Sequence, residues 1–372
     1  MGEDLFQNLP SEMIINILSR LDCRTTIRAK CVCKPWLDLL TTHEFVKSHL
    51  SKSLTGLVIV ERKSVSMMTY KMVDELDLNL YLNLYCGLSI SVFNLDLPFC
   101  IEIHTSINGL ILLREWRCGY SILCNPVTRD FIKLPYPGNP LCSLKLELYG
   151  FGVSRMSEKY KVVRISPEKH NHSPELKYSN SDECECQVYT VGTGAWRRIG
   201  KCGEIRDLSD NSLMPMTFLC GNLHWWWKST QISSLDLETE LFSTFSGPPC
   251  VKGGYMSSLM GCLCVCHNSY MQINMWVMKK YGDEKSWTKE FSMLRDCTIW
   301  DCLRHLDPIK VFRNGDMLMS HRKGRPLYYS RNDKTIRYLD VDLFKSNGNG
   351  IRPYTPSFLS LKTFATENVT SF

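Results

Sequence analysis

Hydrophobic residues change their period near residue 54 of this 372-residue chain, which divides the chain into two regions of different secondary structure. Before that point apolar residues recur every three or four positions, as on amphipathic helices. After it, short apolar runs alternate in steps of two and are interrupted by Gly, Pro and Asn, as in β-strands. We therefore predict a small helical domain at 1–50, a mainly β domain at 51–361 and a flexible tail at 362–372.

The first 50 residues predict three or four short helices. A stripe of apolar residues indicates a helix over about 10–21. Asp22 is placed to cap a second helix, and Pro35 both ends that helix and can open a third. A last helical stretch follows at 45–50. A unit of this size cannot bury a large core, so we expect a partner surface to complete it.

The helical segment combines LPSEMIINILSRL (9–21) with VCKPWLDLL (32–40), and together these resemble the F-box. Their shared features are the Leu-Pro opening, the acidic residue two places on, the apolar pairs and the Val-Cys-Lys-x-Trp spacing. The sequence departs from the usual pattern at Cys23, where proline is common, and at Thr25 and Thr26, where Lys-Ser is frequent. These departures fall between helices and affect local geometry only.

The resemblance implies that the helical domain docks on a Skp-type linker protein of a Skp-cullin-F-box ubiquitin ligase. An amphipathic helix binds an apolar groove through anchors at helical spacing, which agrees with this role. The residues that the resemblance offers for the contact are Leu9, Pro10, Met13, Ile14, Ile17, Leu18, Val32 and Trp36. Some of these eight must also belong to the domain's own core, and the sequence does not show which residues face the linker and which face the core.

The β domain carries a coarse repeat in which an apolar strand pair leads to a polar turn and then to an aromatic residue. The spacing of these aromatic residues is close to the roughly 40 to 50 residues of a four-stranded propeller blade. The aromatic residues are Phe131, Trp196, Phe242, Trp287 and Tyr338. We predict a β-propeller-like domain of five or six units. A β-sandwich is the alternative, because it also produces short strands with regular turns.

Several fragments, in order along the chain, resemble the F-box-associated interaction domain of plant F-box proteins. They include SINGLILL, CNPVTRDFIKLP, VYTVGTGAWRRIG, GNLHWW and NGDMLM. The resemblance spans roughly 55–361, and SFLSL (357–361) is similar to the last strand of that domain. It implies a relation to kelch-type propellers and a role in recruiting a target protein.

Composition excludes several classes of partner and compartment. The formal net charge of +6 is a mild excess spread along the chain, so we expect no nucleic-acid or anionic-membrane partner. The sequence has no secretory signal pattern and no apolar run of the roughly 18 residues needed to span a bilayer. We expect a cytoplasmic or nuclear protein whose 18 cysteines are reduced.

Candidate catalytic and metal motifs are weak. Cys262, Cys264 and Cys266 share one face of an extended strand, about 6.5 Å apart, too far for all three to reach one zinc ion. We interpret them as core residues and expect neither a metal nor a cofactor. The chain has no GxSxG elbow, no phosphate-binding loop and no HExxH motif.

These observations favour a non-catalytic substrate-recognition subunit that binds the linker, and through it the cullin, and recruits an unknown target. The alternatives are a regulatory F-box module without ligase function and a propeller-type enzyme. Recognition residues usually lie on loops of a rigid β scaffold, so we expect the target on the loop at 168–183 or on a basic turn. That basic turn consists of His321, Arg322, Lys323 and Arg325.

Overall fold

Four short helices open the chain, as the sequence predicts. A computed structural model gives the fold, and the residues that it describes are 9–62, 68–73, 93–97, 102–114, 120–137, 147–167, 184–202, 216–228, 230–268, 272–294, 306–312, 314–321, 326–339, 351–364 and 368–371. The helices are α1 (Ser11–Leu18), α2 (Cys23–Ala29), α3 (Lys34–Leu39) and α4 (His43–Lys52), and we call residues 9–52 the helical domain. Asp22 caps α2 by accepting a hydrogen bond from the backbone N–H of Thr25 at 2.9 Å, and Pro35 lies in the first turn of α3. Two expectations are wrong here: Cys23, Thr25 and Thr26 lie in α2, not between helices, and α2 ends at Ala29, before it reaches Pro35. In the part of the chain just defined, no helix is long and apolar enough to cross a membrane.

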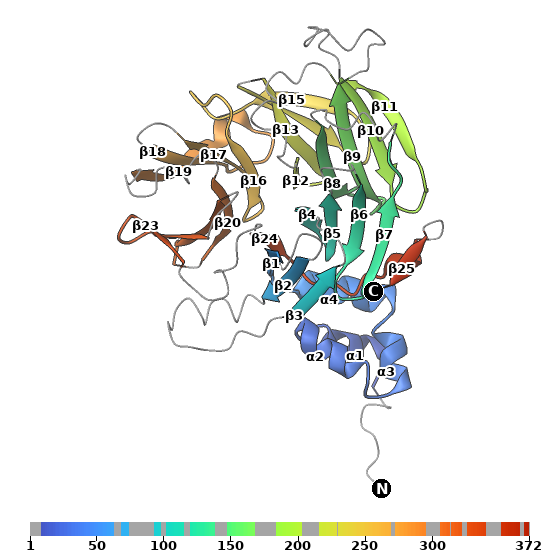
Figure 1. The fold of residues 1–372 in the computed structure, drawn as a ribbon. Coiled ribbons are helices and arrows are strands. Elements are labelled where there is room, and N and C mark those ends of the chain that lie inside the picture. The colour runs from blue at the N-terminus through green and yellow to red at the C-terminus, as the bar shows by residue number, and fades with distance from the viewer. Residues whose placement is uncertain are drawn as a thin grey trace.

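Six antiparallel sheets make up the β domain, and we number them as blades 1 to 6 (Figure 1). Each blade is given from its inner strand outward. Blade 1 consists of β24 (Ile351–Tyr354), β1 (Gly56–Arg62), β2 (Met68–Val73) and β3 (Phe93–Leu97). Blade 2 consists of β4 (Glu102–Ile107), β5 (Leu110–Arg114), β6 (Ser121–Asn125), β7 (Asp130–Leu134) and β25 (Val369–Ser371). Blade 3 consists of β8 (Leu148–Val153), β9 (Tyr160–Pro167), β10 (Cys184–Thr190) and β11 (Trp196–Cys202).

The other three blades repeat the same four-stranded plan. Blade 4 consists of β12 (Thr217–Leu219), β13 (Asn222–Lys228), β14 (Gln231–Asp236) and β15 (Phe242–Ser246). Blade 5 consists of β16 (Tyr255–Leu259), β17 (Cys262–Asn268), β18 (Gln272–Met278) and β19 (Trp287–Leu294), with a short 3₁₀ turn (Glu284–Ser286) before β19. Blade 6 consists of β20 (Leu306–Val311), β21 (Met317–His321), β22 (Leu327–Ser330) and β23 (Thr335–Tyr338). The five aromatic residues of the predicted repeat all lie in the fourth strand of a blade, in β7, β11, β15, β19 and β23.

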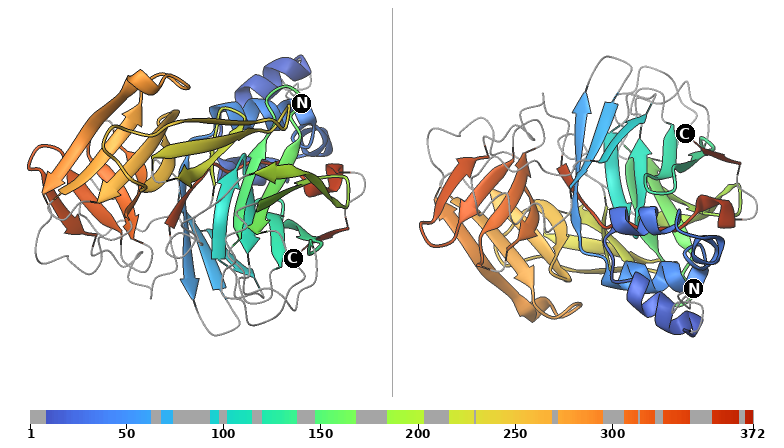
Figure 2. Two further views of the ribbon diagram at one scale, coloured as in Figure 1. Left: turned by 90° about the horizontal axis from the view of Figure 1, so that it is seen from above. Right: turned by 90° about the horizontal axis from the view of Figure 1, so that it is seen from below.

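The inner strands contact one another in a closed ring, which makes the β domain a propeller. The order around the ring is β24, β4, β8, β12, β16 and β20, and β20 returns to β24. Figure 1 shows these strands around the centre of the ring, and Figure 2 shows the molecule from above and from below that view. Blade 1 closes the ring because it combines the two ends of the domain: β24 pairs with β1, placing Ile351 opposite Ile59 and Tyr354 opposite Gly56. The ring confirms the propeller prediction and rules out the sandwich.

Buried side chains fill the space between neighbouring blades. Cys264 of blade 5 packs in one cluster with Met317 of blade 6. Trp225 belongs to the cluster between blades 3 and 4, whereas its neighbour Trp226 packs against the cluster between blades 4 and 5. Consecutive residues of a strand point to opposite faces, so one strand joins two blade interfaces.

The chain after β24 differs from the sequence prediction. SFLSL is not the last strand: residues 355–360 have no strand partner, and the carbonyls of Ser357 and Leu359 accept hydrogen bonds from the Asn125 side chain instead, at 3.0 and 2.7 Å. The predicted flexible tail also contains ordered structure. A 3₁₀ turn forms at Leu361–Thr363, and β25 pairs with β7 as a fifth strand of blade 2. Periodicity misses the path of 355–360 because hydrogen bonds from the Asn125 side chain, not a sheet ladder, hold that segment.

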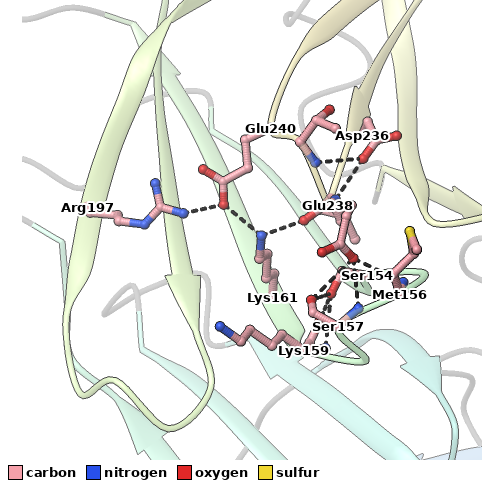
Figure 3. A network of polar contacts seen from close by, with 11 residues as sticks. Ser154, Met156, Ser157, Lys159, Lys161, Arg197, Asp236, Glu238 and Glu240 are labelled. Carbon is pink, nitrogen blue, oxygen red and sulfur yellow. Dashed lines mark hydrogen bonds and ion pairs between the residues drawn. The ribbon is translucent and has the colours of Figure 1, made fainter.

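A buried lysine joins blade 3 to the β14–β15 turn of blade 4 (Figure 3). Lys161 of β9 donates hydrogen bonds to Glu240 Oε1, at 2.7 Å, and to the carbonyl of Leu237. Glu238 of the same turn accepts from the backbone N–H of Ser157 at 3.0 Å. These contacts fix the two blades relative to each other.

Candidate functional site

The helical domain exposes an unusual share of large apolar side chains. Of the ten exposed large hydrophobic residues found in the described ranges, four lie in this small domain. They are Met13 (53% exposed) and Ile17 (45%) on α1, Val32 (64%) after α2, and Leu37 (43%) on α3. Met13 and Ile17 are one helical turn apart and therefore share a face of α1. Exposed apolar residues at this density are typical of a protein-binding surface.

The structure divides the eight predicted contact residues into two groups. Leu18 is buried in the domain's own core, and Ile14 and Trp36 are partly buried against that core. The remaining five have at least partial access to solvent: Leu9, Pro10, Met13, Ile17 and Val32. These five, together with Leu37, define the exposed apolar face of the helical domain.

Leu37 is the residue of this face that sequence reasoning missed. Leu37 lies at helical spacing from Leu40, and of these two residues only Leu40 is fully buried. Residues three apart on a helix can share a face, so period alone allowed Leu37 to be a core residue. The direction from which the other helices approach α3 decides its exposure.

Polar contacts hold the helices that present this face. Burial alone would raise the pKa of the Asp22 carboxyl, but hydrogen bonds from Thr25 outweigh it and lower that pKa, as expected for an ionised N-cap. Lys52 of α4 donates to Ser19 Oγ at 2.6 Å and to Asn16 Oδ1 at 3.0 Å, which ties α4 to α1. The exposed apolar residues therefore lie on a folded scaffold.

The core of the helical domain includes residues of the propeller. Phe358, from the segment after β24, is 3% exposed and lies in one cluster with Phe45 and Leu40. The Phe358 ring meets the His49 ring edge-on, with centroids 4.9 Å apart. Burial lowers the pKa of His49 below its ordinary value, so the ring is neutral at pH 7. The helices are thus packed onto the propeller, not attached by a free linker.

The two faces of the propeller have different roles in this packing. In antiparallel blades, the turns between the first and second strands and between the third and fourth strands lie on one face. The helical domain lies on this turn face: Lys47 of α4 forms an ion pair of 2.5 Å with Glu158 of the β8–β9 turn, and Val127 of the β6–β7 turn packs against the helical core. Figure 1 shows the helices beside blades 1 and 2.

The predicted target-binding segments connect strand ends on the opposite face. β9 runs away from the turn face and ends at Pro167, and β10 begins at Cys184, so 168–183 joins two ends on the far face. The same alternation applies to β21, which ends at His321, and β22, which begins at Leu327. The 168–183 segment itself, Arg322, Lys323 and Arg325 lie outside the described residues, as does the side chain of His321.

Two arginines share one buried carboxylate near the far face of blades 2 and 3. Arg114, the last residue of β5, forms an ion pair of 3.0 Å with Glu147, and Arg164 of β9 contacts the other oxygen of the same carboxylate. Arg164 also donates to Gln187 at 2.7 Å and to the Pro137 carbonyl at 3.1 Å. Because these hydrogen bonds fix the guanidinium groups, the cluster stiffens the scaffold beneath the far-face connections.

The cysteine run of β17 is part of the core. Cys264 and Cys266 are buried, and burial raises the pKa of Cys264 to about 12, which disfavours the thiolate that metal binding or nucleophilic attack requires. Within the described ranges, no group of three or more His, Cys, Asp or Glu side chains is arranged to hold a metal ion.

Comparison with known families gives two matches that together span most of the chain. Residues 6–48 match the F-box domain, and residues 80–352 match the F-box associated beta propeller domain. The first match overlaps the helical domain, and the second covers the blades from β3 to the start of β24. The stretch between the two matches, 49–79, includes the point near residue 54 where the hydrophobic period changes.

The chain is also similar to curated plant proteins. F-box protein CPR1 of Arabidopsis thaliana is 26% identical over 360 residues, which cover 88% of this chain and 78% of that protein. The F-box/kelch-repeat protein At3g23880 of the same plant is 25% identical over 351 residues, covering 88% and 89%. Among solved structures, a chain of the nidogen/laminin complex overlaps with a TM-score of 0.44 at 8% identity, over 80% of this chain and 98% of that chain.

Proposed function

Because the chain belongs to the family of F-box proteins with an F-box associated β-propeller domain, we propose that it is a substrate receptor of a Skp-cullin-F-box ubiquitin ligase. In this role the helical domain, its F-box, binds a Skp-type linker protein. The linker connects the chain to the cullin, and the propeller holds the target. The proposal places the protein in the cytoplasm or nucleus.

The observation that carries the proposal is the exposed apolar face of the helical domain. Met13 and Ile17 are exposed on one face of α1 although the domain has a filled core beneath them. Large apolar side chains left in solvent by a folded helix favour insertion into an apolar groove, where a few anchors supply most of the binding energy. This is the chemistry that a Skp-type linker would recognise.

The proposed contribution of this chain to ubiquitination is proximity. A receptor that holds the linker on one side and the target on the other converts the meeting of a target lysine with a charged E2 into an effectively intramolecular step. No group of the receptor needs to react. The rigid packing of the helices on the turn face supports this role, since a fixed receptor limits the volume that the bound target can explore.

We place the target on the far face of the propeller. The helical domain occupies part of the turn face, so a linker and cullin bound there leave the far face free. The connections at 168–183 and 322–325 join strand ends on that face, and rigid β scaffolds commonly mount recognition residues on such connections. Residues His321, Arg322, Lys323 and Arg325 remain our candidates for recognising carboxylate or phosphate groups of the target.

The experiment that tests the proposal is reconstitution of a ligase from the full chain, a Skp-type linker, a cullin with its RING partner, and E1 and E2 enzymes. Targets would first be identified by proximity labelling with the full chain and with an exposed-face variant, Val32→Asp. A receptor gives ubiquitinated target with the full chain and none with the variant. Binding of linker without ubiquitination of any captured target would indicate the regulatory module instead.

A further inference from the structure

The chain from 351 to 361, which we call the closing segment, is shared by the propeller and the helical domain. Its first part is β24, the strand that closes the ring by pairing with β1. Its second part leaves the sheet and passes between blade 2 and the helices. The strand that closes the propeller and the residues that contact the helices are therefore neighbours in the sequence.

On the helical side, the closing segment supplies a core residue. Phe358 lies in the cluster of Ile15 and Leu18 from α1 and of Phe45 from α4. The ring centroids of Phe358 and Phe45 are 6.1 Å apart, and Lys30 Nζ lies 4.5 Å from the Phe358 centroid. A domain of this size has few core residues, so loss of one large aromatic side chain should loosen all four helices.

On the propeller side, the closing segment is fixed by close approach and by a buried amide. Ser357 is fully buried against Gly109 of the β4–β5 turn, where φ is +82° and an added Cβ would lie 2.4 Å from Ser357 Cβ. The Asn125 side chain donates to the carbonyls on both sides of Phe358, those of Ser357 and Leu359. The backbone flanking Phe358 is therefore held by blade 2.

The short stretch of chain between β24 and Phe358 makes the propeller contacts and the helical contacts depend on each other. β24 ends at Tyr354, and Phe358 follows four residues later. Four extended residues span at most about 14 Å. Phe358 can therefore reach the helical core only when β24 is near its place in the ring, next to Gly109, whose carbonyl accepts from the Tyr354 hydroxyl at 3.3 Å.

We propose that the closing segment couples closure of the propeller to folding of the helical domain, so that a chain whose propeller is open does not present a competent linker-binding face. The consequence for ligase assembly rests on the proposed function; the coupling itself rests on the contacts above. In a receptor built in this way, a chain whose propeller is open, and which therefore cannot hold a target, does not bind the linker. The closing segment thus makes linker binding depend on a closed propeller.

The test uses hydrogen exchange of the full chain without any partner, so it does not depend on linker binding. Two variants disturb the coupling from opposite sides. Phe358→Ala removes the core residue, and Asn125→Ala removes the blade 2 hydrogen bonds to the closing segment. Asn125 Oδ1 also accepts from the N–H of Val127, which packs against the helical core, so Val127→Ala measures the part of the effect that comes from this turn. Phe291→Ala is the matched control, because Phe291 is a buried phenylalanine of blade 5 remote from the helical core. Phe358→Leu keeps most of the apolar volume and serves if Phe358→Ala does not fold.

We expect both Phe358→Ala and Asn125→Ala to raise amide exchange in α1 and α4 at least tenfold while β9 and β10 stay protected, and Phe291→Ala to leave the helices unchanged. Affinity for a Skp-type linker should fall at least tenfold in the same two variants. Unchanged helix exchange in Asn125→Ala, or equal loosening by Phe291→Ala, would overturn the coupling. A parent chain that binds no linker would instead overturn the proposed function, and the exchange result would still decide the coupling.

Discussion

Lys161 and Glu240 form an ion pair of 2.7 Å across the interface of blades 3 and 4, and both side chains are largely buried. Burial alone would raise the pKa of Glu240, but hydrogen bonds from Arg197 and Lys161 outweigh it and lower that pKa. The lysine also donates to the Leu237 carbonyl, so its ammonium group is well satisfied (Figure 3). The pair is a point at which two blades depend on each other.

Replacing Glu240 by Gln should destabilise the propeller strongly. The change leaves the Lys161 ammonium buried without a counter-charge, which typically costs about 3–5 kcal/mol. The matched control is Glu290→Gln, because Glu290 forms a pair of 2.6 Å with Lys279 on the surface, where such pairs contribute about 0–1 kcal/mol. Denaturant unfolding of both variants measures the difference. Equal losses in the free energy of unfolding would show that burial does not control the strength of these ion pairs.

A methyl group at Gly109 should be far more harmful than one at Gly261. Both glycines have positive φ, +82° and +72°, so alanine is strained by about 1–2 kcal/mol at either position. Only at Gly109 would the new Cβ overlap Ser357, whereas at Gly261 nothing lies within 4 Å. We expect a further loss of about 1–3 kcal/mol for Gly109→Ala, from thermal unfolding. Similar stabilities would mean that Ser357 does not approach the β4–β5 turn so closely.

The stability of the propeller should fall as the pH drops from about 6.5 to 4. Burial lowers the pKa of His224 to about 4, and Nδ1 of the neutral ring donates to the Thr217 carbonyl. The unfolded chain binds a proton near pH 6.5, so the contribution of His224 is complete above that pH and is lost as the pH approaches 4. His224→Asn should reduce the slope of stability against pH by up to about 1.4 kcal/mol per pH unit. An unchanged slope would mean that groups other than His224 cause the pH dependence of stability.

The thiols should fall into two reactivity classes. Burial raises the pKa of Cys124, Cys202 and Cys264 to about 12, so these thiols should resist labelling in the folded chain. Cys220 and Cys250 are exposed and should react at once. Mass spectrometry after brief alkylation, with and without denaturant, measures both classes. Rapid labelling of Cys264 in the folded chain would contradict its core position.

Local sequence signals predicted most of the architecture. The Asp22 cap and Pro35 marked two helix starts because capping and first-turn proline act within a few residues. Trp196 and Trp287 marked the fourth strands of blades 3 and 5 because each blade repeats one local pattern. These features depend on residues that are close together in the sequence, so they can be predicted from a single sequence.

The features that sequence did not predict depend on contacts between distant segments. The pattern SFLSL reads as a strand, yet Phe358 lies among the helices and its flanking carbonyls bond to Asn125. The helical period of α1 likewise marks both Leu18 and Ile17 as apolar but does not tell which one faces inward. That choice is made by α4 and by the closing segment, whose positions no local pattern contains.

The most direct test of the account is the affinity of the purified full chain for a purified Skp-type linker, measured by calorimetry with two matched variants. Val32→Asp places a charge on the exposed apolar face, and Leu241→Asp places one on an equally exposed leucine of the propeller turn face. The account predicts tight binding by the parent and by Leu241→Asp, and a loss of at least a hundredfold for Val32→Asp, since a charge in an apolar groove is poorly solvated. No binding by the parent, or equal binding by all three chains, would contradict it.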